Sequence, residues 1–190
     1  MRSRPDRLAA AHLRRRARAS AALLLALAWI TGAGFVGTGD AGAEESRFVP
    51  WEGAPTPALE LRDLSGRPFA LADYRGHVVL VNFWATWCEF CKDEVASMKK
   101  LQQQFAGRPL VILLVNYGES ASKVRAYADR LPADVRVLLD PDHDVARGWR
   151  VRVVPSSFLV AADGRVRYRV IGNLDWASEE SLRTVRALLP

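Results

Sequence analysis

Both cysteines of the chain lie directly behind a strongly apolar stretch, and only two residues separate them. Cys88 and Cys91 follow the run Val78–Trp84, which reads VVLVNFW and predicts a strand buried on both faces. From Cys88 to Gln104 the apolar side chains recur at helical spacing, so the cysteines open a helix. One sulfur then reaches the other across a single turn. The pair can therefore switch between a dithiol and a disulfide.

The position of Cys88 at the start of this helix favours an attacking thiolate. Unpaired N–H groups and the helix dipole stabilise an anion there, which makes Cys88 the expected nucleophile. Cys91, one turn further along, is placed to resolve the mixed disulfide that Cys88 forms with a partner. Lys92 would support the anion, and Glu89 in the first turn would oppose it. We also expect Thr86 to cap the helix.

Three other uses of a cysteine pair need to be compared with thiol–disulfide exchange. A structural disulfide is the main alternative in an oxidising compartment. A zinc site is disfavoured, because there is no second cysteine pair and His12, His77 and His143 are scattered. Covalent haem attachment fails because Lys92, and not a histidine, follows Cys91. Exchange chemistry explains the pair best, and the structural disulfide stays open.

The first 43 residues have the form of an export signal. A basic region ends at Arg18, and the mostly apolar stretch Ala19–Val36 follows it. Small residues at positions 41–43 (AGA) suit a signal peptidase and predict a mature start at Glu44. An uncleaved membrane anchor is the alternative, because the apolar stretch can just span about 30 Å of hydrocarbon. In either case we expect the rest of the chain in the periplasm.

Charge separates this N-terminal segment from the body of the chain. The formal net charge is +6, but residues 1–43 hold seven arginines against only Asp6 and Asp40. Residues 44–190 are nearly neutral, with 20 basic and 19 acidic side chains. The high pI therefore belongs mostly to the N-terminal segment, and a nucleic-acid partner loses its main support. The body is long enough to bury a sizeable core.

The body alternates strands with helices after an extended, proline-containing lead-in at residues 44–57. Turn residues predict one hairpin at its start, and Asp163-Gly164 marks another near its end. The pattern predicts an α/β fold over residues 58–190, with a central mixed β-sheet flanked by helices. The expected strands are Ala58–Leu61, Pro68–Leu71, His77–Trp84, Leu110–Asn116, Val135–Leu139, Ser157–Val160 and Arg165–Ile171. The expected helices are Cys88–Gln104, Ser120 or Glu119 to about Leu131, His143–Trp149, and Asp175 or Ser178 to Leu189.

The segment around the cysteines resembles the active site of a known family. VVLVNFWATWCEFCKDE is similar to that of the TlpA/ResA/CcmG-like thiol–disulfide oxidoreductases, thioredoxin-superfamily proteins with a redoxin or AhpC/TSA-like domain. The resemblance runs from about Ala54 to the C-terminus and includes VNYGES at Val115–Ser120 and the segment Val137–Gly172. Trp-Cys-x-x-Cys followed far downstream by Val-Pro and an apolar strand is specific in combination. The resemblance implies a thioredoxin-like fold with an N-terminal β-hairpin.

The resemblance also implies roles for individual residues. Cys88 would be the nucleophile and Cys91 the resolving cysteine. Pro155 would be a cis-proline facing the disulfide, and Val154 before it would offer its backbone to an extended substrate segment. Trp87 would shield the disulfide beside the substrate groove.

Glu94 is the most informative acidic residue. It lies three residues after Cys91, so both share a helix face. In ResA-like members a glutamate at this offset is implicated in proton transfer, and a partly buried carboxylate can accept the resolving thiol's proton. The alternative is an exposed glutamate paired with Lys92 or Lys99. For Trp84, Asn82 and Tyr117 we favour core or surface roles over roles in the site.

Two departures from the family's pattern affect the site. Glu89 and Phe90 stand between the cysteines, where the family commonly has proline before the second cysteine. These positions tune the redox potential, so the family's potential does not carry over. Ala96 stands where many relatives have a proline that kinks the helix, and we expect a weaker kink here.

The predicted function is periplasmic disulfide reduction by a Cys88–Cys91 dithiol/disulfide cycle. The expected substrates are protein disulfides, with apocytochrome c or a metallochaperone first, and a membrane thiol electron donor restores the dithiol. We expect a monomer with no nucleic-acid partner, no metal and no cofactor beyond the redox-active disulfide. The alternatives are a net disulfide oxidant or isomerase, and a non-catalytic thioredoxin-fold binding module with a structural disulfide.

Overall fold

The structure is a computed structural model that describes residues 47–52, 55–132 and 135–190. The expected export signal at residues 1–43 lies outside these residues, so its cleavage stays a prediction. Within the described ranges, no helix has both the length and the apolar character needed to cross a membrane.

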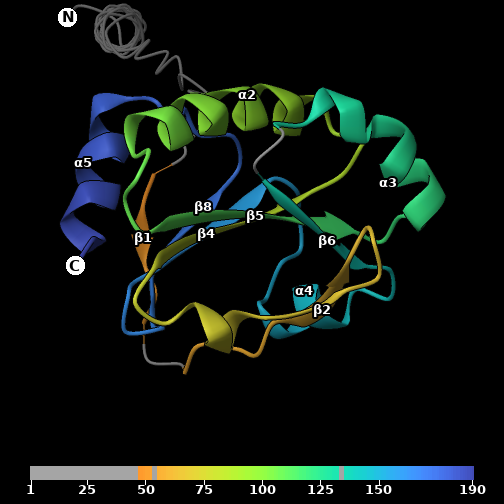
Figure 1. The fold of residues 1–190 in the computed structure, drawn as a ribbon, viewed down its shortest axis with the longest axis horizontal. Helices are drawn as coiled ribbons and strands as arrows, with labels where there is room; N and C mark the ends of the chain where they lie inside the picture. The colour runs from red at the N-terminus through yellow and green to blue at the C-terminus, as the bar shows by residue number, and fades with distance from the viewer. Residues whose placement is uncertain (1–46, 53–54, 133–134) are drawn as a thin grey trace, which may run out of the picture. The chain divides into compact units, whose positions relative to one another are not determined.

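The described residues contain a single mixed sheet of eight strands. The strands are β1 (Val49–Pro50), β2 (Glu60–Asp63), β3 (Pro68–Ala70), β4 (Val78–Trp84), β5 (Leu110–Tyr117), β6 (Arg136–Asp140), β7 (Ser156–Val160) and β8 (Val166–Ile171). Their order across the sheet is β1-β8-β7-β4-β5-β6-β2-β3 (Figure 1). β5 pairs in parallel with β4 and β6, and the other neighbours are antiparallel.

Helices cover both faces of the sheet. They are α2 (Glu89–Gln104), α3 (Ala121–Tyr127), α4 (Asp144–Gly148) and α5 (Glu179–Leu188). Short 3-10 turns follow β3 at Leu71–Tyr74 and α3 at Ala128–Arg130. α2, α3 and α5 lie on one face, and α4 lies on the other (Figure 1).

All seven residues of the central strand β4 are buried, because each face of the strand supports its own apolar cluster. Side chains alternate between the two faces of a strand. Val78, Leu80 and Trp84 therefore join the cluster beneath α2, whereas the odd-numbered residues of β4 join the cluster on the α4 face. This two-sided burial is the physical reason for the continuous apolar run.

The expected mixed α/β fold is confirmed, with element ends displaced by a few residues. Ser120 and Ser178 are the N-caps of α3 and α5, so the later of each pair of predicted starts is correct. The N-terminal hairpin is present as β2 and β3. Two pairings were not indicated by the sequence: β1 of the lead-in joins β8, and β2 joins β6.

Candidate active site

Cys88 and Cys91 lie at the N-terminal end of α2 and are joined by a disulfide. Cys88 is the N-cap of the helix, and its Sγ accepts a hydrogen bond from the Cys91 N–H at 3.2 Å. This places the sulfur where a helix terminus stabilises a thiolate. Cys88 is 6% exposed and Cys91 is fully buried. Cys88 is therefore the sulfur that a partner reaches first.

The expectation that Thr86 caps α2 is wrong, because a buried carboxylate binds this residue instead. The Thr86 N–H and hydroxyl donate to the two carboxylate oxygens of Glu119, each at 2.7 Å. Glu119 also accepts from Asn116 Nδ2 at 2.8 Å and pairs with Lys123 Nζ at 2.7 Å. These contacts tie the turn before Cys88 to the end of β5.

The partners of Glu119 keep it ionised. Burial by itself would raise the pKa of Glu119, but the Lys123 ammonium, the Thr86 donors and the Asn116 amide outweigh burial and lower the pKa to about 2. The side chain is 5% exposed. Glu119 is thus a permanent negative charge held by a cation and neutral donors.

Glu94 is fully buried on α2, and its hydrogen-bond partners are neutral. Trp176 Nε1 donates to Oε1 at 2.9 Å, and Asn82 Nδ2 donates to Oε2 at 2.9 Å. The Ser157 hydroxyl lies 3.5 Å from Oε1. The alternative of an exposed glutamate beside a lysine is therefore wrong. Of the two lysines considered on α2, Lys92 pairs with Glu89 instead.

These surroundings allow Glu94 to exchange a proton near neutral pH. Burial raises the pKa of Glu94, and the hydrogen bonds from Trp176, Asn82, the Leu174 backbone and Ser157 offset only part of the rise. The resulting pKa is about 7. A carboxyl with this pKa, three residues past Cys91 on one helix, can accept the proton of the resolving thiol.

None of the four residues that donate to Glu94 was predicted to do so from the sequence. Asn82 interrupts the apolar run of β4, and this single polar residue in a buried strand was an available signal. Ser157 follows Pro155 by two residues, but nothing marked its side chain as facing the site. Trp176 lies in the segment before α5 and gave no signal. Our placement of Asn82 in the core is right for its burial and incomplete for its contacts.

The Val154–Pro155 peptide bond is cis, as the resemblance implied. Pro155 is buried and Val154 is half-buried at the start of β7. β7 pairs with β4, and Ser156 lies opposite Phe83 near the end of β4 that leads to the cysteines. The cysteine pair and the cis-proline are therefore brought to the same edge of the sheet.

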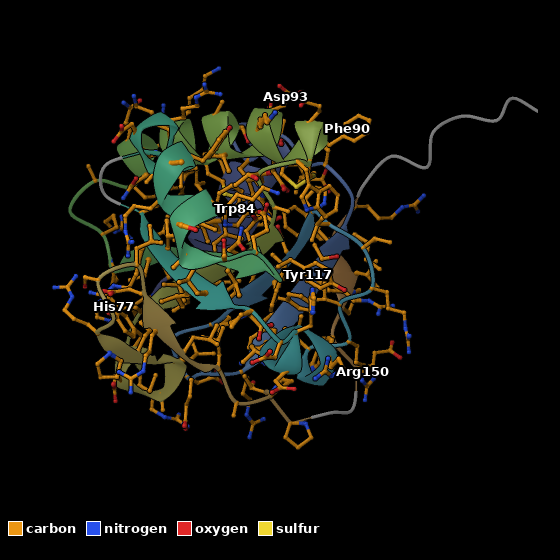
Figure 2. The ribbon with its side chains drawn as sticks, turned by 90° about the vertical axis from the view of Figure 1, so that its right-hand side faces the viewer. His77, Trp84, Phe90, Asp93, Tyr117 and Arg150 are labelled. Atoms are coloured by element: carbon orange, nitrogen blue, oxygen red, sulfur yellow. A yellow bond between two sulfur atoms is a disulfide. The ribbon has the colours of Figure 1, made fainter. Side chains whose placement is uncertain are left out.

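Large apolar side chains within two residues of a cysteine or of Pro155 remain exposed: Trp87 (59%), Phe90 (67%) and Val153 (54%). Figure 2 shows Phe90 projecting outward at one end of α2, whereas Trp84 lies in the interior. Trp84 packs against the Tyr127 ring at 5.7 Å, which confirms the expected packing role. Exposed apolar groups beside a reactive sulfur can contact a protein partner.

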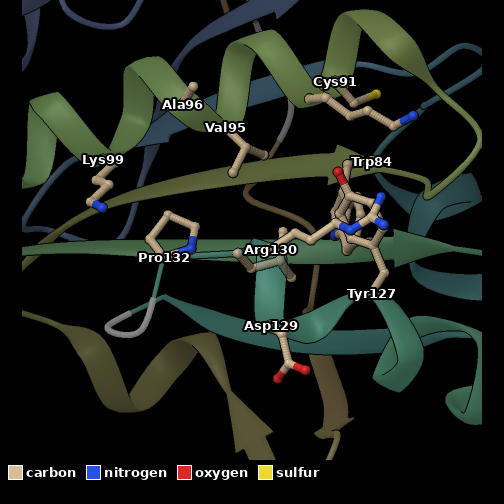
Figure 3. Close-up of a pocket in the computed structure, with 11 residues that line it drawn as sticks. Trp84, Cys91, Val95, Ala96, Lys99, Tyr127, Asp129, Arg130 and Pro132 are labelled. Atoms are coloured by element: carbon tan, nitrogen blue, oxygen red, sulfur yellow. The ribbon is translucent and has the colours of Figure 1, made fainter.

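A hollow of about 280 Å³ lies between α2 and the segment after α3 (Figure 3). Two of its charged groups already have partners, because Lys92 pairs with Glu89 and Arg130 lies over the Tyr127 ring. We assign the hollow no ligand. Its lining is Trp84, Cys91, Lys92, Val95, Ala96, Lys99, Tyr127, Asp129, Arg130, Leu131 and Pro132.

Two further observations concern α2 and metals. α2 continues as one helix through Ala96. Within the described ranges, no group of three or more His, Cys, Asp or Glu side chains is placed to hold a metal ion.

Comparison with known proteins agrees with this geometry. Residues 53–169 match the AhpC/TSA family. The thiol-disulfide oxidoreductase ResA of Geobacillus thermodenitrificans is 34% identical over 122 residues, which cover 64% of this chain and 70% of that protein. ResA of Geobacillus kaustophilus is 31% identical over 138 residues, which cover 73% and 78%.

A solved structure gives the same answer for the fold. A candidate thiol:disulfide interchange protein DsbE from Chlorobium tepidum superposes with a TM-score of 0.67 at 25% identity. The match covers 75% of this chain and 100% of that one. The chain belongs to the AhpC/TSA family and is a thiol-disulfide oxidoreductase of the ResA/DsbE type, with Cys88 and Cys91 as its cysteine pair.

Proposed function

We propose that this protein is a periplasmic disulfide reductase. The reduced protein attacks a disulfide in a protein substrate, and the reaction leaves the protein oxidised, with a Cys88–Cys91 disulfide. The oxidised pair is then reduced again by a membrane thiol electron donor, because an oxidising compartment offers no glutathione pool. No group other than the cysteines needs to carry electrons in this cycle.

The first step is attack by the Cys88 thiolate on one sulfur of the substrate disulfide. A bond forms between Cys88 and that sulfur, and the other substrate sulfur leaves as a thiolate. Cys91 then gives its proton to Glu94 and attacks Cys88 Sγ. The bond between Cys88 and the substrate breaks, and the second substrate thiolate leaves. Two electrons have passed from the dithiol to the substrate.

The observation that carries the proposal is the buried Glu94 carboxyl, held by neutral donors on the helix of the cysteines. A disulfide with a purely structural role has no use for a proton acceptor beside it. A buried carboxyl is costly for folding. A role in accepting the proton of the resolving thiol explains why this one is present.

The substrate side of the site is formed by Trp87, Val154 and Pro155. The half-buried Val154 before the cis peptide bond supports the role that the family resemblance implies, in which its backbone binds an extended substrate segment. The substrate class that the resemblance favours is apocytochrome c with its haem-binding cysteines, and metallochaperone thiols are second.

The test is to trap mixed disulfides with Cys91→Ser in the native cell envelope and to identify the bound proteins. The expected catch is a cysteine protein of the cytochrome c or metallochaperone class, and Cys88→Ser serves as the empty control. Recovery of no disulfide-linked protein would count against the reductase cycle. A redox potential near the strongly oxidising value of roughly −120 mV would instead indicate a net oxidant.

A further inference from the structure

Only the nitrogen of the Asn82 side-chain amide has hydrogen-bond partners. Its Nδ2 donates to Glu94 Oε2 at 2.9 Å and to Ser157 Oγ at 2.8 Å. Its Oδ1 is buried and has no hydrogen-bond partner, a condition shared among the described residues only by Trp84 Nε1. Native structures rarely leave a buried acceptor unpaired, so the unpaired oxygen calls for an explanation.

The groups around Glu94 suit its ionised form. From the segment before α5, Trp176 Nε1 and the Leu174 backbone N–H donate to the carboxylate, and neither of these N–H groups can accept a hydrogen bond. From β4 and β7 come the amide of Asn82 and the hydroxyl of Ser157. From α2 itself, the titratable group one turn before Glu94 is the Cys91 thiol of the reduced protein. In the part of the chain that the structure describes, no cation forms an ion pair with Glu94.

Protonation of Glu94 changes what the carboxyl group needs. The neutral acid carries an O–H that must find an acceptor, since a buried donor without a partner costs about 1–3 kcal/mol. Of the side chains bonded to Glu94, only those of Asn82 and Ser157 have an acceptor oxygen. One N–H of Asn82 points at Oε2, so an acid proton on Oε2 would face a donor and not an acceptor.

A half-turn of the amide removes this conflict. Exchanging Nδ2 and Oδ1 places the oxygen toward Glu94 and Ser157, where it can accept from the acid O–H and from the serine hydroxyl. Each orientation leaves the other end of the amide without a partner among the described residues, and in the turned orientation that end is the NH2 group with its two N–H donors. The turn is therefore favourable only while Glu94 is protonated and donates its O–H to Oδ1.

We propose that Asn82 is a positioning residue whose amide turns over with the protonation of Glu94, donating to the carboxylate and accepting from the acid. Glu94 then stays hydrogen-bonded in the same place before and after it takes a proton. This inference extends the proposed function, since it concerns how the proton acceptor of Cys91 is held.

The direct test is nuclear magnetic resonance of the oxidised protein across the titration of Glu94. Above the midpoint of the pH titration followed at the Glu94 carboxyl carbon, the Asn82 amide protons are expected to show nuclear Overhauser cross-peaks to Ser157. Below it, these cross-peaks are expected to disappear, with the same midpoint. Glu94→Gln should abolish the change. Cross-peaks that persist on both sides of the midpoint would overturn the proposal.

A pair of variants separates a turning amide from a fixed donor. Trp176→Phe removes a group that can only donate, so the proton affinity of Glu94 should rise about tenfold. Asn82→Leu removes a partner of both protonation states, so the rise should be no more than about threefold. An equal rise in the two variants would mean that Asn82 only donates, and the proposal would be wrong.

These measurements need no turnover, so they are independent of the reductase function. If Glu94→Gln left substrate reduction unchanged, the proton-transfer role of Glu94 would fail while the amide result stood. If the cross-peaks stayed constant and Glu94→Gln slowed the resolving step, the turning amide would be wrong while the proton-transfer role of Glu94 stood.

Discussion

Glu94 and Glu119 are two buried glutamates near the same cysteine pair, and their carboxyl groups have very different pKa values. The pKa of Glu94 is raised to about 7, and that of Glu119 is lowered to about 2. Burial opposes ionisation of both. The difference therefore comes from their partners.

Glu119 has a cation, Lys123, together with the backbone N–H and hydroxyl of Thr86. Glu94 has neutral donors only. The cation keeps Glu119 ionised, so this carboxylate can hold the turn at Thr86 permanently. Glu94, held by neutral groups, can gain and lose a proton during a reaction. Both residues are buried glutamates, so their different roles come from their hydrogen-bond and ion-pair partners. Glu119 acts as a structural anchor, meaning a permanently charged group that holds a turn, and Glu94 acts as a proton acceptor.

The largest expected difference between them is kinetic. Glu94→Gln should slow resolution of a Cys88 mixed disulfide by about 100-fold, because Cys91 loses its proton acceptor. The ionisation near pH 7 should vanish from the pH profile. Stopped-flow measurement with a model mixed disulfide checks this result.

Glu119→Gln is the matched control for that experiment, since it removes a buried charge that is bonded to Thr86, two residues before Cys88. It should keep the ionisation near pH 7. A profile that lost this ionisation in Glu119→Gln but kept it in Glu94→Gln would reverse the assignment.

The two residues should also give opposite dependences of stability on pH. Between about pH 4.5 and 7 the folded state keeps a proton on Glu94 that the unfolded state has released, so stability falls as pH rises, by on the order of 3 kcal/mol. Glu119 contributes stability above its ordinary pKa of 4.5, and this is lost as pH falls toward 2. Urea unfolding of the oxidised protein over this range measures both.

Single variants identify which residue causes each pH dependence of stability. Glu94→Gln should remove the decline between pH 4.5 and 7, and Glu119→Gln should weaken the loss in acid. An unchanged decline in Glu94→Gln would show that another group is responsible.

Removing the Glu119 side chain should destabilise the fold by about 2 kcal/mol, because Thr86 and Asn116 lose their acceptor. Thermal or urea unfolding of Glu119→Ala at neutral pH measures the effect. Glu179→Ala is the control: it removes an exposed ion pair with Arg183 and should change stability by less than about 1 kcal/mol. Equal effects would mean that Glu119 is not an anchor.

The smallest effect is expected at Thr86. Thr86→Val deletes the hydroxyl donor but keeps the N–H bond to Glu119, so the cost should be about 1 kcal/mol. Thr184→Val, which removes an exposed hydroxyl bonded within α5, should have almost no effect by the same unfolding measurement. A larger loss at Thr184 would contradict the view that the turn before Cys88 is held by this network.

The local features of the protein follow from short stretches of its amino-acid sequence. The apolar run Val78–Trp84 predicted a central strand because alternating side chains buried on both faces leave no polar face. The spacing of Cys88 and Cys91 predicted exchange chemistry, since four consecutive residues suffice for it. The family resemblance, and not periodicity, implied the cis bond before Pro155 and a role for Glu94.

The pKa values of Glu94 and Glu119, in contrast, depend on tertiary packing. Asn82 and Trp176 are far apart in the chain and meet at Glu94 only after β4, α2 and the segment before α5 have packed. Thr86 was expected to cap a helix, but it donates instead to Glu119, which lies in the segment between β5 and α3. A pattern of neighbouring residues reports faces and turns, whereas a pKa depends on burial and on hydrogen bonds between distant segments.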